Sequence, residues 1–239
     1  MCHRLLPMAT DRPPMSLVRG LAHDLLNPLS SLLGFLSLLL APDAKDPLTA
    51  RQRRMLTAMD RACVHLLGTM RDLAELSRGE EGLWTPTRAP TDLRLLAESL
   101  LPDLRDFTAL RRVAITVEAE PDVPAVPVVE RLVERFFDAL FRAVERLTPE
   151  GGAIHLRLAP AGDGGVAGVL EATGEERPPE YWEAAFSATL RDPRPADGYV
   201  SLGLALARRI ALFHGGSLEA GPRPEGGTLF CFRFPPARA

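Results

Sequence analysis

The chain has 239 residues, of which 46% are hydrophobic and 25% are charged, and its formal net charge is -3. This profile is typical of a globular protein of one or two domains, and the charge gives no indication of nucleic-acid binding. The three cysteines, Cys2, Cys63 and Cys231, are far apart and odd in number. They therefore exclude a disulfide framework and a cysteine-based metal site. Free thiols and the lack of a targeting signal favour the cytoplasm.

A first helix is expected from about residue 16 to residue 41. Its apolar positions step alternately by threes and fours, as in a helix that packs in a bundle. These positions are Val18, Ala22, Leu25, Leu29, Leu32, Leu36 and Leu39. His23 directly follows Ala22, and Asn27 lies four residues further on, so both project from one outer side of the helix. An accessible imidazole beside the carboxylate of Asp24 can act as a nucleophile, although a plain surface histidine is the simpler interpretation.

A polar turn with two prolines at 42–47 precedes a second expected helix, from about 49 to 78. It has a similar apolar stripe, so the two helices form an antiparallel hairpin. One hairpin cannot bury both stripes, and a second copy would complete a four-helix bundle, which predicts a homodimer. The alternative is that the stripe packs on the C-terminal part of the same chain. The leucine-rich stretch 29–40 is too short to cross a membrane, and we expect no membrane contact.

The remainder of the chain alternates helical and strand patterns after a linker at 79–90. The expected elements are helices at 92–110, 128–147 and 203–213 and strands at 113–118, 151–158, 165–172 and 226–234. Helices on one face of a mixed sheet predict a two-layer α/β sandwich, so the fold class is α+β. The expected domains are a tail at 1–15, the hairpin at 16–83 and the sandwich at 84–239.

The motifs, in this order, resemble the core of bacterial histidine kinases. His23-Asp24-x-x-Asn27-Pro28 resembles the phosphoacceptor box. The stretch 148–152 (TPEGG) resembles the turn after the asparagine box of the ATP-binding domain, and 202–216 resembles its last glycine box. The resemblance implies that His23 carries a phosphoryl group and that Asp24 orients its ring and acts as a base. It also implies that Asn27 orients a water that removes phosphate from a partner's aspartate.

The asparagine box departs from the family where the metal-binding amide belongs. Arg142 or Ala143 stands at that position, with Asp138 one turn earlier. Neither residue supplies a neutral amide oxygen, and arginine has no acceptor at all.

The glycine boxes depart from the family as well. Ala172 replaces the aspartate that would bind the adenine amino group, and Glu176 replaces the second glycine, although Gly174 is kept. In the last box, Tyr199 and Ser201 occupy the places of two glycines before the retained Gly203. Glycines in such a loop allow backbone to approach phosphates, which a tyrosine prevents. The resemblance therefore implies a fold without the usual nucleotide contacts, and we expect no cofactor and no metal.

Three functions follow from these motifs. The favoured one is a histidine phosphotransferase that passes a phosphoryl group between His23 and the aspartates of response-regulator receiver domains without ATP. A second is an active histidine kinase with atypical contacts to ATP and magnesium. A third is a non-catalytic module that binds a kinase or a regulator, or a phosphatase that acts through Asn27. Receiver domains and a second copy of the chain are the expected partners.

Overall fold

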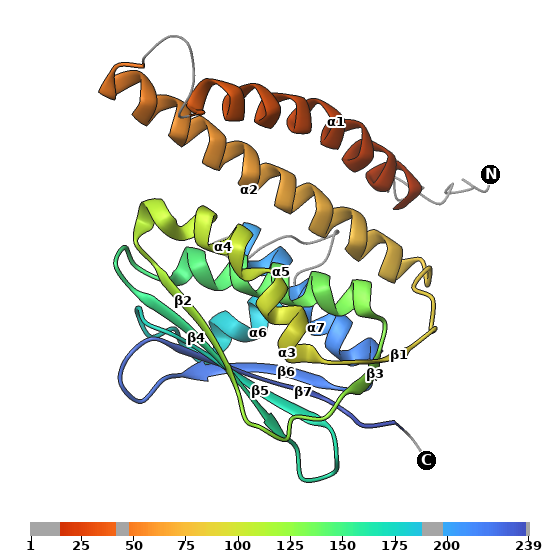
Figure 1. Cartoon of the computed structure of the whole chain (residues 1–239). Coiled ribbons are helices and arrows are strands. Elements are labelled where there is room, and N and C mark those ends of the chain that lie inside the picture. The colour runs from red at the N-terminus through yellow and green to blue at the C-terminus, as the bar shows by residue number, and fades with distance from the viewer. Residues whose placement is uncertain (1–14, 42–47, 188–197, 238–239) are drawn as a thin grey trace, which may run out of the picture.

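The computed structural model describes residues 15–41, 48–187 and 198–237, with the backbone alone at 15–24, 106–107, 110 and 198–199. The chain forms a helical hairpin followed by a two-layer α/β sandwich, as Figure 1 shows. The predicted fold class is confirmed. A single chain is described, so the dimer of hairpins stays a prediction.

The hairpin consists of α1 (Met15–Leu40) and α2 (Ala50–Glu80), which pack side by side (Figure 1). A capping box sets the start of α2. Thr49 Oγ1 accepts a hydrogen bond from the backbone N–H of Gln52 at 3.3 Å, and Gln52 Oε1 accepts one from the N–H of Thr49 at 2.9 Å. Two of the unpaired amide groups at the helix start are satisfied in this way.

Two of the five described residues of the predicted apolar stripe of α1 are buried in one chain. Leu29 and Leu36 are buried, whereas Leu25, Leu32 and Leu39 are 48%, 51% and 48% exposed. The C-terminal half of α2 packs instead on the sandwich, where Leu76 joins the main hydrophobic core. The alternative of packing within the chain is therefore confirmed for that half of α2, and the stripe of α1 stays open.

The C-terminal sandwich, residues 89–234, contains two sheets. A small antiparallel pair is formed by β1 (Ala89–Thr91) and β3 (Val126–Val128). The main sheet has the order β2-β4-β5-β7-β6, with β2 and β4 parallel and the other pairs antiparallel. Its strands are β2 (Ala114–Ala119), β4 (Ala153–Pro160), β5 (Val166–Ala172), β6 (Ser217–Pro222) and β7 (Thr228–Phe234).

Helices cover one face of this sheet and lie between it and the hairpin (Figure 1). They are α3 (Leu93–Ser99), α4 (Leu101–Thr108), α5 (Glu130–Leu147), α6 (Pro179–Ser187) and α7 (Gly198–Phe213), with a short 3₁₀ turn at Ala109–Arg111. The core lies between α5 and the strands. Phe136 of α5 meets Phe232 and Phe234 of β7 edge to face, with ring centroids 5.0 and 5.3 Å apart. Gly168 of β5 has no room for a side chain because the ring of Phe232 lies against it.

The structure differs from the predicted elements at several places. The helix expected at 92–110 is divided near Leu100, because Pro102 has no N–H to continue the ladder and starts α4. The helix expected from 203 begins at Gly198, where Val200 and Leu202 are buried. The strands β1 and β6 and the helix α6 were not predicted, because they are short and contain proline or glycine.

Candidate functional site

The phosphoacceptor-like motif lies in the middle of α1. The helix continues through Pro28 to Leu40, and Asn27 is exposed on its surface. The side chains of His23 and Asp24 fall outside the described residues. His23 lies 17 residues before the end of α1, and the same count from the start of α2 reaches Leu67. The antiparallel hairpin therefore places the backbone of His23 at the level of the part of α2 that contacts the sandwich.

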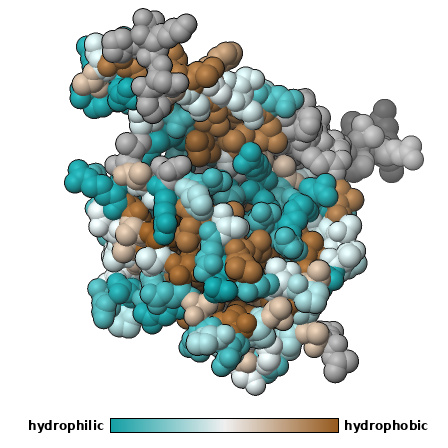
Figure 2. Space-filling view, viewed as in Figure 1, coloured by the Kyte–Doolittle hydropathy of each residue, from teal (hydrophilic) through white to brown (hydrophobic). Residues whose placement is uncertain are grey.

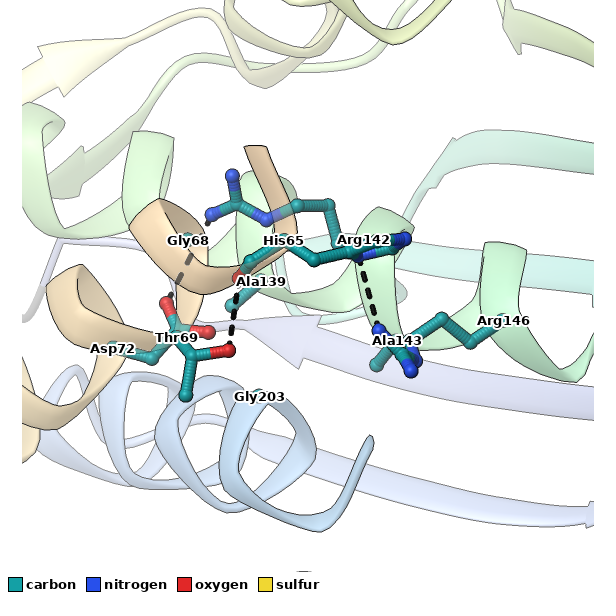
Figure 3. A pocket seen from close by; sticks show the side chains of 9 residues that line it. All are labelled: His65, Gly68, Thr69, Asp72, Ala139, Arg142, Ala143, Arg146 and Gly203. Atoms are coloured by element: carbon teal, nitrogen blue, oxygen red, sulfur yellow. Dashed lines mark hydrogen bonds and ion pairs between the residues drawn. The ribbon is translucent and has the colours of Figure 1, made fainter. Parts of the chain in front are cut away.

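At that level, a charged cluster connects α2 with α5. Arg135 and Arg142 lie three residues before and four residues after Asp138 on α5, and both donate to the same carboxylate oxygen, Asp138 Oδ2. Arg135 also donates to Asp72 Oδ1 of α2 at 2.5 Å, and Arg142 Nη2 lies 3.9 Å from that oxygen. Figure 3 shows Arg142 reaching from α5 along α2 toward Asp72. The cluster thus crosses the contact between the hairpin and the sandwich.

Gly68 of α2 leaves the space that the side chain of Arg142 occupies. A Cβ atom at residue 68 would lie 2.9 Å from Arg142 Cζ, so any side chain there would displace the guanidinium. Next to it is a cavity of about 20 Å³ between α2, α5 and α7, lined in part by His65, Thr69, Asp72 and Arg146 (Figure 3). This volume holds roughly one water molecule and no nucleotide.

Two ionisable groups of this cavity have displaced pKa values. Burial raises the pKa of Asp72 to about 6, with a smaller upward contribution from Asp138, although Arg135 and Arg142 oppose the rise. Burial, followed by the charges of four arginines of which Arg146 has the largest effect, lowers the pKa of His65 to about 4. His65 is therefore neutral at pH 7, and its Nδ1 lies 3.0 Å from Arg146 Nη1.

The helix α7 carries the residues expected from the last glycine box. Gly203 packs closely on α5, since a Cβ there would lie 3.1 Å from the carbonyl oxygen of Ala139. Ser201 is buried, and its Oγ has no hydrogen-bond partner in the described structure. The side chain of Tyr199 is outside the described residues. Gly203 therefore joins Asp138 and Arg142 at the charged cluster, where it allows α7 to lie against α5.

The residues expected from the first glycine box gather at the end of β5. Ala172 is buried with 3% of its surface exposed. Gly174 has a φ of +153°, and a Cβ there would lie 3.0 Å from the carbonyl oxygen of Leu147. Glu176 is exposed two residues later. This group therefore lies against the C-terminal end of α5, the helix that also carries Arg142.

Sequence reasoning missed Asp72, Gly68 and His65, because nothing in the resemblance assigns a role to the second helix at these positions. A signal was present on the other side of the contact. The spacing Arg135, Asp138 and Arg142 is that of a helix-surface ion-pair set.

Within the described ranges, no group of three or more His, Cys, Asp or Glu side chains is placed to hold a metal ion. None of the helices in those ranges is long and apolar enough to cross a membrane.

Comparisons with known proteins assign the two parts of the chain to two protein families. The family model of the His Kinase A (phospho-acceptor) domain matches residues 15–82. The model of the histidine kinase-, DNA gyrase B- and HSP90-like ATPase matches residues 126–238. The chain belongs to the bacterial sensor histidine kinases and carries their core. It is thus a histidine kinase-family core of two-component signalling.

Curated relatives agree with this assignment. The alginate biosynthesis sensor protein KinB of Pseudomonas aeruginosa is 26% identical over 95% of this chain and 38% of its own length. The adaptive-response sensory kinase SasA of Thermosynechococcus vestitus is 28% identical over 90% of this chain and 58% of its own length. The chain thus spans about two to three fifths of the relatives that it matches. The crystal structure of full-length ShkA in complex with AMPPNP has the same fold, with a TM-score of 0.63 and 24% identity over 95% of this chain and 47% of that one.

Proposed function

We propose that this histidine kinase core works as a histidine phosphotransferase, passing a phosphoryl group between His23 and the aspartates of receiver domains without using ATP. The observation that carries the proposal is the position of Arg142. A cation stands where a neutral amide would face the metal, and its guanidinium is already paired with Asp138 and close to Asp72. Like charge disfavours a second cation there.

The adenine end of the expected nucleotide site supports the same proposal. Ala172 offers a methyl group where the family has a carboxylate, and it is buried at the end of β5. A charge-assisted hydrogen bond contributes roughly 1.5–3 kcal/mol, so its absence lowers affinity about ten- to a hundred-fold. Among the described side chains of α7, Ser201 Oγ is the buried polar atom without a hydrogen-bond partner, and a single hydroxyl does not replace a phosphate loop. The residues at these positions therefore do not fit ATP and magnesium.

The proposed reaction needs a nucleophile and an acyl phosphate. A ring nitrogen of His23 attacks the phosphorus of a receiver's aspartyl phosphate, so that an N–P bond forms as the O–P bond breaks and the aspartate carboxylate leaves. Asp24 accepts the N–H of the other ring nitrogen and favours the reactive tautomer. Transfer to a second receiver is the reverse of the same step. The magnesium ion belongs to the receiver, and the chain supplies only the imidazole and its orientation.

The surface of the hairpin supports a homodimer. Figure 2 shows hydrophobic side chains gathered along it, and eight large ones are at least 39% exposed in one chain. They are Leu25, Leu32, Phe35, Leu38, Leu39, Met55, Met59 and Leu66. A second hairpin of the same sequence would cover them and complete a four-helix bundle. The proposal places the dimer in the cytoplasm, where thiols such as Cys63 stay reduced.

Calorimetry with ATP and magnesium, together with phosphoryl transfer from a labelled receiver, tests the proposal. We expect no measurable heat of ATP binding at millimolar nucleotide, and we expect a phosphorylated receiver to label the wild type but not His23→Ala. Labelling of the wild type by radioactive ATP, lost in His23→Ala, would overturn the proposal.

A second candidate is an ATP-dependent histidine kinase with atypical nucleotide contacts. Two observations favour it: the relative SasA is described as a sensory kinase, and Gly174 and Gly203 are retained. It predicts ATP-dependent labelling of His23, which the same experiment detects. Arg142→Asn then separates the two candidates further, because an added amide should raise the ATP-dependent labelling rate of a weak kinase, whereas a chain that does not use ATP should gain no such labelling.

A further inference from the structure

Each acid–arginine ion pair that the described residues form between α2 and α5 or α7 places the acid on α2, while Arg71 of α2 also lies near Arg135 and Arg142. Carboxylates of α2 pair with arginines of α5 and α7. The pairs are Asp72 with Arg135 at 2.5 Å, Glu75 with Arg131 at 2.7 Å and Glu80 with Arg209 at 2.5 Å. Such a one-sided arrangement favours one position of the sandwich along α2, because a shift of one helical turn would separate each acid from its arginine.

The arginines of α5 are oriented before they meet α2. Asp138 holds Arg135 and Arg142 from within α5, which reduces the side-chain entropy that the contact must fix. Gly68 leaves the space that Arg142 fills. The two surfaces are therefore matched in charge and in shape.

The linker strengthens the contact at its far end. Trp84 donates its indole N–H to Glu75 Oε1 at 2.7 Å, and its ring packs edge to face on Phe213 of α7. The carboxylates of Asp72 and Glu75 are only 8% exposed, so salt screens them little. Buried pairs of this kind add little net affinity, yet losing one partner leaves an uncompensated charge, so they mainly fix the relative position of the two parts.

We propose that these acid–arginine pairs fasten the C-terminal sandwich to the C-terminal half of α2, next to the level of His23, so that the sandwich is a fixed platform instead of a mobile catalytic domain. The platform role toward a receiver rests on the proposed function, whereas the fastening does not. Arg142 then has a structural task in place of a metal-binding one. A receiver that approaches His23 would meet a preformed surface made of the hairpin and the sandwich.

Charge reversal at the most accessible pair tests the fastening. Glu80 and Arg209 have 22% and 30% exposed side chains, so single reversals there are compatible with folding. In Glu80→Arg or Arg209→Glu, we expect amide hydrogen exchange in residues 65–80 and 131–142 to become about three- to tenfold faster, with a larger radius of gyration in X-ray scattering. The double variant, which restores a pair with the charges exchanged, should return both values to near those of the wild type.

The matched control is Arg94→Glu, which breaks a comparably exposed pair with Glu98 inside α3 and away from the contact. It should leave both measurements unchanged. Single reversals that change neither value, or a double variant that fails to restore them, would overturn the fastening. The measurements use the full chain without ATP or a receiver, so this result and the test of phosphoryl transfer can fail independently.

Discussion

The hairpin and the C-terminal sandwich differ in how far their apolar side chains are buried within one chain. The sandwich is complete within one chain, since the aromatic rings of α5 and β7 are fully enclosed between the helices and the sheet. The hairpin is not, since α1 buries only Leu29 and Leu36 of its described stripe. The comparison shows that the sandwich buries its apolar residues within one chain, whereas the hairpin leaves apolar residues exposed. The proposed dimer would cover these exposed residues.

The largest expected effect is the loss of stability when a core side chain of the sandwich is truncated, compared with the same kind of truncation on the hairpin. Phe136→Ala should lower the free energy of unfolding of the sandwich by about 3–5 kcal/mol, because Phe136 is fully buried against Phe232 and Phe234. Urea unfolding followed by the fluorescence of the buried Trp182 measures it. Leu38→Ala on the 71% exposed face of α1 is the control, and an equal loss there at concentrations that keep the chain monomeric would contradict the comparison.

The next prediction concerns the open face of the hairpin. Leu32→Glu combined with Phe35→Glu places two charges on that face, and we expect dimerisation to weaken roughly a hundred-fold or more. Sedimentation over a concentration series measures the dissociation constant. Leu95→Glu, at a 55% exposed leucine of α3, should leave it unchanged. Unaltered association of the hairpin variant would show that the stripe is not the dimer contact.

A smaller effect is expected at the joint between the two parts. Gly68→Ala should destabilise the chain by about 1–3 kcal/mol, because the new Cβ would lie 2.9 Å from Arg142 Cζ. In Arg142→Ala the obstruction is gone, so the same glycine substitution should have much less effect. A double-mutant cycle in urea unfolding gives the coupling. Additive effects would mean that Gly68 is needed for its backbone and not for the space it leaves.

The smallest expected effect concerns the pH dependence of stability, to which His65 and Asp72 of the same cavity contribute in opposite directions. His65 has a lowered pKa of about 4 in the folded chain. Its contribution to the free energy of unfolding is therefore present above pH 6.5, the pKa of the unfolded chain, and is lost as the pH falls toward 4. Asp72 has a raised pKa of about 6 in the folded chain. Its contribution to the free energy of unfolding is therefore present below pH 3.8, the pKa of the unfolded chain, and is lost as the pH rises through 6. The two slopes oppose each other between pH 4 and 6.

Replacing either group should therefore leave the pH dependence of stability that the other group causes. In Asp72→Asn, stability should rise from pH 4 to pH 6.5, and in His65→Gln it should fall over the same range, each by about 1 kcal/mol once solvent screening is included. Thermal unfolding in a pH series measures the slopes. Slopes of the same sign in both variants would contradict this assignment.

Much of the fold could be predicted because its signals are local. The alternation of β5 and β7 and the spacing of apolar residues in α1, α2 and α5 are periodic patterns that one face of each element must satisfy. Strands such as β6 were not predictable in this way, since Ser217–Pro222 has little strand propensity and exists because β7 offers it an edge to pair with.

The sequence by itself determined the order of the motifs and the helix that carries His23, because each is a matter of residue type and spacing. It also predicted that Arg142 or Ala143, and Ala172, stand at positions where the family binds nucleotide. Only the tertiary structure decided what Arg142 contacts. Residues 72, 135 and 142 come together because α2 lies across α5, and no local pattern specifies which helices pack against each other. The same packing raises the pKa of Asp72, since burial depends on the neighbours that the fold supplies.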